Sequence, residues 1–122
     1  MFYQNTFVPE LYKSDTQVVV DIGKAIAQQR EHRLETYERS MESIKRLAAV
    51  RRKVNATEPI AMPLLEVFNE KVGIADGQRR LRALDDAGYT TVTIIVVPRG
   101  HDGVGKAEQI AIVKRKVGVD PN

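Results

Sequence analysis

The chain has 122 residues, of which 43% are hydrophobic and 29% charged, a balance that excludes a disordered protein and fits one globular domain. It contains no cysteine, which excludes disulfides and thiolate chemistry, and its net charge of +3 is compatible with nucleic acid without being diagnostic of it. It has no apolar run long enough to cross a bilayer and no signal-peptide pattern, so we expect a cytoplasmic protein with no membrane partner.

The first segment, Met1 to Asp15, combines aromatic residues with a proline. Exposing several aromatic rings is unfavourable, so we expect an irregular arm or short strand that docks on this domain or on another subunit. The aromatic residues are Phe2, Tyr3, Phe7 and Tyr12.

Thr16 to Val54 is predicted to be a long N-terminal helical region, with a break near Gly23 that divides it into two helices. Apolar residues recur in it at alternating spacings of three and four, which places them on one stripe. The stripe comprises Leu34, Tyr37, Met41, Ile44 and Ala48. It either packs on the domain's own sheet or joins two copies of the chain, and the second possibility predicts a homo-oligomer through the N-terminal helix.

The same region is rich in positive charge. From Arg30 to Lys53 there are eight Lys or Arg residues against four Glu. Such a cluster is either a solvated helix face or a contact surface for nucleic acid. The candidate nucleic-acid-binding residues are Lys45, Arg46, Arg51, Arg52 and Lys53.

The middle of the chain predicts a β-hairpin. Pro59 and Pro63 exclude helix and favour extended backbone before them. The residues from Ile60 to Phe68 contain β-formers, and a turn at Asn69-Glu70 leads into a second strand, Lys71–Ala75, which ends at an Asp-Gly turn.

A short helix is predicted at Gln78–Ala87, stopped by Gly88, and a strand follows at Thr91–Val97. The apolar run of that strand suggests burial on both faces. After a glycine-rich loop, Ala107–Val117 is open to helix or strand, and its β-branched residues favour a strand.

The turn between the hairpin and this helix is a candidate anion site. Gly77 allows a sharp turn and close approach, while Arg79 and Arg80 add positive charge at a helix start that already favours anions. Asp76 is either a simple N-cap or a ligand-positioning group. Arg82 lies on the same helix and has carboxylates three and four residues later as alternative partners.

The stretch TEPIAMPLLEV…KVGIADGQRRLRALDDAGYTTVTIIVV resembles the ParB/sulfiredoxin-like superfamily in its order of Pro-Ile strand, Gly-x-Arg-Arg turn, helix, glycine stop and apolar strand. The resemblance covers about Thr57 to Val97. It implies an α+β fold with a small mixed sheet and short helices, here preceded by the long N-terminal helical region. The chain then divides into an arm and helical extension at 1–54 and a ParB-like core at 55–122, which we expect to form one compact unit.

The resemblance also implies that the turn binds a nucleoside triphosphate, CTP or ATP, with Mg²⁺. The cofactor-binding places fall on Gly77, Gln78, Arg79 and Arg80, and the acidic place on Asp76. The reductase branch of the family needs a cysteine at this turn, so that activity is excluded. Gln78 stands where other members carry Glu or His.

Three functions are compatible with these features. The first is a domain that binds a nucleotide or nucleic-acid phosphate in plasmid or phage DNA metabolism or partitioning. The second is a metal-dependent nuclease or nucleotide hydrolase, with Asp76, Glu58 and His101 as catalytic candidates, although no dedicated metal site is predicted. The third is a catalytically inert oligomeric interaction protein.

Overall fold

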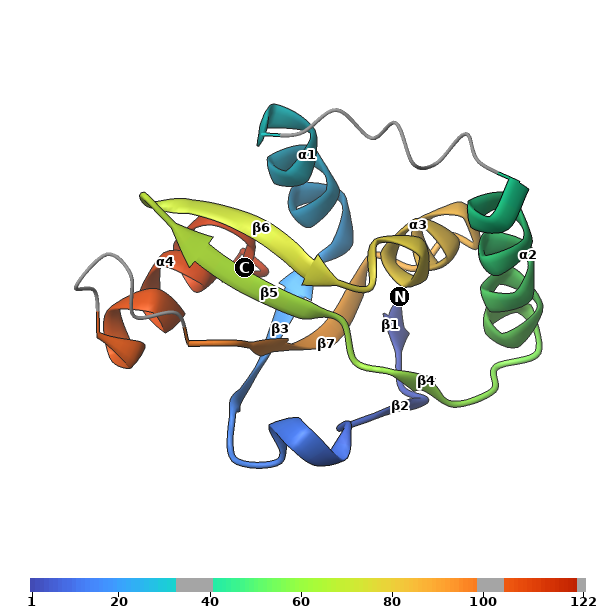
Figure 1. Cartoon of the computed structure of the whole chain (residues 1–122), viewed down its shortest axis with the longest axis horizontal. Coiled ribbons are helices and arrows are strands. Elements are labelled where there is room, and N and C mark those ends of the chain that lie inside the picture. The colour runs from blue at the N-terminus through green and yellow to red at the C-terminus, as the bar shows by residue number, and fades with distance from the viewer. Residues whose placement is uncertain (33–40, 99–104, 121–122) are drawn as a thin grey trace.

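The structure, a computed structural model, describes residues 1–32, 41–98 and 105–120 (Figure 1). Within these ranges the chain is an α+β fold with a curled five-stranded mixed sheet and a two-stranded sheet beside it. The larger sheet contains β1 (Phe2–Tyr3), β3 (Thr16–Asp21), β5 (Leu64–Phe68), β6 (Lys71–Asp76) and β7 (Thr91–Val96). The smaller contains β2 (Thr6–Phe7) and β4 (Ile60–Ala61). The helices are α1 (Ile22–His32), α2 (Met41–Asn55), α3 (Gln78–Asp86) and α4 (Lys106–Val117), with a short 3₁₀ helix, η1 (Glu10–Tyr12).

Strand β7 lies at the centre of the sheet. It is antiparallel to β3 along its whole length and parallel to β1 and β5 along its other edge. Ile94 and Val96 belong to the main core, whereas Ile95, on the opposite face, packs in a second cluster beneath the N-terminal arm. The predicted burial of this strand on both faces is therefore confirmed.

The predicted long N-terminal helical region is wrong. Thr16–Asp21 is the strand β3, and a helix begins only at Ile22. The physical reason is the alternation of TQVVVD, which buries Val18 and Val20 in the core while Val19 points to the other, exposed face. Gly23 lies inside the first turn of α1 and marks no break.

Helix α2 buries a different set of residues from the predicted stripe. It packs mainly on α3 through Leu47, Val50 and Val54, whereas Ile44 is 49% exposed. The position of α3 selects the contact face, and periodicity within α2 did not identify it. Of the other predicted stripe residues, Leu34 and Tyr37 lie outside the described residues.

Residues Lys106–Val117 form the helix α4, so the strand favoured for this segment is wrong. Gln109, Ile112, Val113 and Val117 are buried at helical spacing against the sheet. Packing of this face outweighs the β propensity of its branched side chains.

The other local predictions are confirmed. β5 and β6 pair across a turn in which Asn69 and Glu70 both have positive φ, 50° and 60°. Helix α3 ends before Gly88, whose φ is 90°. The N-terminal arm docks on this domain, with Tyr3 1% exposed. Residues from both 1–54 and 55–122 contribute to one core.

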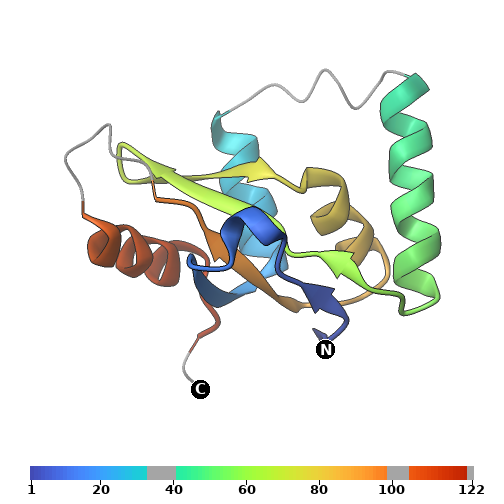
Figure 2. The same ribbon diagram turned by 60° about the horizontal axis from the view of Figure 1, so that its bottom comes forward.

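The sheet separates two layers. Helices α1, α3 and α4 pack on the face that carries the main core, and η1 with the rest of the arm covers part of the opposite face (Figure 2). None of the helices in the described part of the chain has the length and apolar character needed to cross a membrane.

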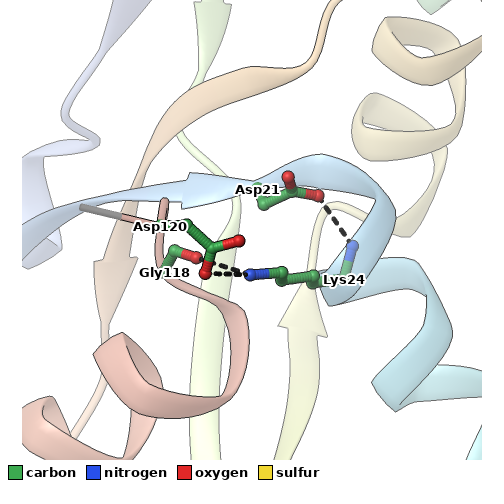
Figure 3. Close-up of polar contacts among 4 residues, drawn as sticks. All are labelled: Asp21, Lys24, Gly118 and Asp120. Atoms are coloured by element: carbon green, nitrogen blue, oxygen red, sulfur yellow. Dashed lines mark hydrogen bonds and ion pairs between the residues drawn. The ribbon is translucent and has the colours of Figure 1, made fainter. Parts of the chain in front are cut away.

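The end of α4 is tied to the start of α1 (Figure 3). The Lys24 ammonium lies 2.9 Å from a carboxylate oxygen of Asp120 and donates to the carbonyl of Gly118 at 3.3 Å. Asp21 accepts a hydrogen bond from the Lys24 backbone N–H at 3.0 Å, as a residue capping the start of a helix does. Gly118 also forms a β-bridge with Val20, so the C-terminal segment closes onto β3.

Candidate phosphate site between α2 and α3

The predicted anion site lies where β6 ends and α3 begins. Gly77 has φ 103° and is the N-cap of α3, with no side-chain capping hydrogen bond. A Cβ added there would lie 3.0 Å from both Cα and Cβ of Pro63. Glycine is therefore required twice, for its backbone conformation and for the close approach to Pro63.

Arg80 is held in place by the chain itself. Its side chain is 17% exposed, one terminal nitrogen donates to the Ala61 carbonyl at 2.9 Å, and the other lies 3.1 Å from a carboxylate oxygen of Asp76. These contacts join α3 to β4 and to the end of β6. Arg80 thus stabilises the conformation of the turn and also contributes a positive charge to it.

Asp76 is the exposed partner of this ion pair. Its side chain is 69% exposed and pairs with Arg80, and the start of α3 has no side-chain cap. The reading of Asp76 as the N-cap is therefore wrong. Its single negative charge offsets only part of the positive charge that Arg79 and Arg80 bring to the turn.

A hollow of about 300 Å³ opens between α2 and α3 at this turn. Its lining residues are Arg46, Ala49, Val50, Asp76, Gly77, Arg79 and Arg80. Arg46 belongs to the predicted nucleic-acid-binding set, and the arginines of α3 belong to the predicted nucleotide-binding set. The fold brings the two sets together, which the sequence reasoning did not foresee, and it adds the apolar wall of Ala49 and Val50.

Backbone groups add to the positive potential of this hollow. The first hydrogen bond within α3 runs from the Leu81 N–H to the Gly77 carbonyl at 3.0 Å, so the three preceding N–H groups have no partner inside the helix. Unpaired amides at a helix start carry roughly half a positive charge, which favours an anion. Three arginines and one aspartate are among the residues that line this hollow, and arginine is the side chain that suits an anion of phosphate type.

Gln78 does not line this hollow. Its side-chain oxygen is buried and has no hydrogen-bond partner among the described residues. The position that the family pattern assigns to cofactor contact is thus turned into the protein.

The remaining basic residues of α2 have different surroundings. Arg51 forms an ion pair with Asp86 of α3 at 2.5 Å, which links the two helices at the surface. Lys45, Arg52 and Lys53 are exposed on α2. The exposed cations extend the positive surface beyond the hollow.

The other catalytic candidates are not brought to this site. Glu58 is exposed, and its backbone carbonyl accepts a hydrogen bond from the Tyr3 hydroxyl at 2.5 Å. His101 lies outside the described residues. Across residues 1–32, 41–98 and 105–120, no group of three His, Cys, Asp or Glu side chains is placed to hold a metal ion.

Comparison of the chain with protein-family models, curated proteins and solved structures finds no match.

Proposed function

We propose that the protein binds the phosphate backbone of nucleic acid, with one phosphate seated in the α2–α3 hollow. The observation that carries the proposal is the convergence of Arg46 from α2 with Arg79 and Arg80 from α3 on that hollow. A role in plasmid or phage DNA metabolism or partitioning is part of the proposal, because the ParB-like resemblance implies it.

The chemistry of the hollow suits a phosphate. Guanidinium groups bind phosphate oxygens through paired, charge-assisted hydrogen bonds, and the start of α3 adds amide donors. Arg80, already bonded to Asp76 and Ala61, acts here mainly as a fixed positive charge. Arg46 and Arg79 supply the two walls of the hollow from different helices.

Nucleic acid is favoured over a free nucleotide by the surface around the hollow. Lys45, Arg52 and Lys53 are exposed along α2, outside the space that one nucleotide would fill. A strand with regularly spaced phosphates uses such additional cations, and each phosphate neutralised releases counterions.

Fluorescence anisotropy with labelled single-stranded and duplex DNA at several salt concentrations tests the proposal. We expect Arg46→Ala and Arg79→Ala each to weaken binding about five- to tenfold and to reduce the salt slope by about one phosphate contact. Arg115→Ala on α4, an exposed arginine at the other end of the molecule, is the matched control.

Equal weakening by all three variants would show that net charge alone attracts DNA, and it would overturn the site. A calorimetric titration with CTP and ATP distinguishes the nucleotide alternative. Saturable nucleotide binding that is lost in Arg79→Ala, without measurable DNA binding, would replace nucleic acid by a nucleotide as the ligand.

A further inference from the structure

A second hollow, of about 280 Å³, lies just beyond the C-terminal end of α2, beside the N-terminal strand β1. The residues that matter in its lining are Phe2, Tyr3, Gln4, Asn5, Thr57 and Tyr89. The whole chain has three Phe and four Tyr, and three of these seven residues are among those that line this hollow. Such a concentration in an otherwise aromatic-poor chain points to a role for the rings.

Tyr3 fixes the N-terminal strand in place beside the hollow. Tyr3 is 1% exposed, its hydroxyl donates to the Glu58 carbonyl, and its ring meets the ring of Tyr89 edge to face at 4.9 Å. Burial, with Tyr89 and Glu58 nearby, raises the pKa of the Tyr3 hydroxyl, so it remains a donor at neutral pH. Phe2, on the same strand, is 41% exposed. Successive side chains of a strand point to opposite faces, so Phe2 presents an exposed ring while Tyr3 anchors the strand in the core.

Carboxamide groups line the hollow together with the rings. Gln4 and Asn5 are exposed, and the Asn5 amide nitrogen donates to the Thr57 carbonyl. An amide offers both donors and acceptors, as the edge of a nucleobase does. Aromatic rings for stacking and amides for edge contacts are the side chains that recognise unpaired bases.

The hollow is joined to the basic end of α2. The Ala56 and Glu58 N–H groups donate to the carbonyls of Arg52 and Lys53, and Thr57 follows directly with φ 51°. A left-handed conformation is strained for a β-branched residue, so this junction is held by its surroundings. With a rise of about 1.5 Å per helical residue, the phosphate hollow and this one are on the order of 10 Å apart along α2.

We infer that the Phe2–Tyr89 hollow binds an unpaired base of a single-stranded nucleic acid whose phosphates lie on α2. The inference rests on the proposed phosphate site and adds the form of nucleic acid that the protein prefers. A few nucleotides of one strand span the distance between the hollows, and a duplex hides the base faces that the rings would stack on.

The test compares three labelled ligands of equal length by anisotropy: a single strand, the same strand with abasic sites throughout, and the duplex. We expect Phe2→Ala to weaken binding of the base-bearing single strand about tenfold, a size typical of one base stacking on an aromatic side chain. Binding of the abasic strand and of the duplex should not change. Phe68→Ala, which truncates a ring that is 53% exposed on β5, is the matched control and should change none of the three.

The outcomes separate the two proposals. Unchanged single-strand binding in Phe2→Ala, or an equal loss on the abasic strand, overturns the base site while leaving the phosphate site intact. Normal binding of all ligands by Arg79→Ala overturns the phosphate site and, with it, the path of the strand over α2, even where Phe2→Ala loses the single strand. Binding of no ligand overturns both. Phe2 is 41% exposed, so we expect the truncated chain to remain folded, and the thermal unfolding midpoint measured alongside checks this.

Discussion

At the scale of single residues, the candidate phosphate site depends on backbone geometry as much as on charge. Arg80 is useful there because it is bonded to Ala61 and Asp76, which fixes the end of β6 against the start of α3. Gly77 permits this arrangement, since its positive φ turns the chain and its missing side chain admits Pro63. Arg80 is thus positioned by one carboxylate and one backbone carbonyl.

We predict that Gly77→Ala lowers the free energy of unfolding by roughly 2–3 kcal/mol, of which about 1–2 is the cost of the left-handed backbone. The rest comes from crowding against Pro63. Gly88→Ala is the matched control, because Gly88 has φ 90° and no atom within 4 Å of an added Cβ. Urea unfolding of both variants checks the difference, and equal losses would show that Pro63 does not restrict the turn.

At the scale of elements, the turn of the β5–β6 hairpin contains a residue, Glu70, whose left-handed backbone conformation is unfavourable for its side chain. Both turn residues adopt positive φ, the pattern of a two-residue turn that favours Asn followed by Gly. The chain has Asn69 and then Glu70. Glu70 also lies 4.0 Å from Arg115, but both side chains are largely exposed, so this pair contributes little.

We expect Glu70→Gly to raise the free energy of unfolding by about 0.5–1 kcal/mol, because relief of the left-handed strain exceeds the added chain entropy of glycine. Glu70→Gln keeps the strain and removes the charge, so its stability should match that of the parent chain. Thermal unfolding followed by circular dichroism measures both. Destabilisation by Glu70→Gly would mean that the Arg115 contact matters more than the turn.

At the scale of the whole molecule, the C-terminal segment closes onto β3 and the start of α1. β3 joins the centre of the sheet, and the segment after α4 bridges Val20 through Gly118. The exposed ion pair between Lys24 and Asp120 lies beside this bridge (Figure 3). A Cβ at Gly118 would lie 2.2 Å from the Lys114 carbonyl oxygen, a distance that no side chain tolerates.

Gly118→Ala should therefore shift the end of α4 and destabilise the protein by about 2–4 kcal/mol, within the range of substitutions that force a packed backbone to move. Asp120→Asn removes the Lys24 ion pair and should cost less than about 1 kcal/mol, as exposed pairs do. Chemical denaturation distinguishes the two. A larger loss in Asp120→Asn would show that charge, and not backbone closure, holds the C-terminal segment.

The local parts of this protein follow from its sequence alone. The turn at Asn69-Glu70, the helix that starts after Gly77 and the stop at Gly88 each depend on residues that adjoin one another, so adjacent letters predict them. The candidate anion site at the turn before α3 was predicted in the same way, because Gly77 and the arginines Arg79 and Arg80 are close neighbours in the sequence.

Tertiary structure alone decided the rest. Thr16–Asp21 becomes a strand because β7, far along the chain, supplies its partner, and Lys106–Val117 becomes a helix because the sheet selects its apolar face. Arg46 reaches the hollow at Arg79 only because α2 packs on α3. Contacts between distant segments select one of the patterns that a short segment carries, so the shape of the site formed only once the chain had folded.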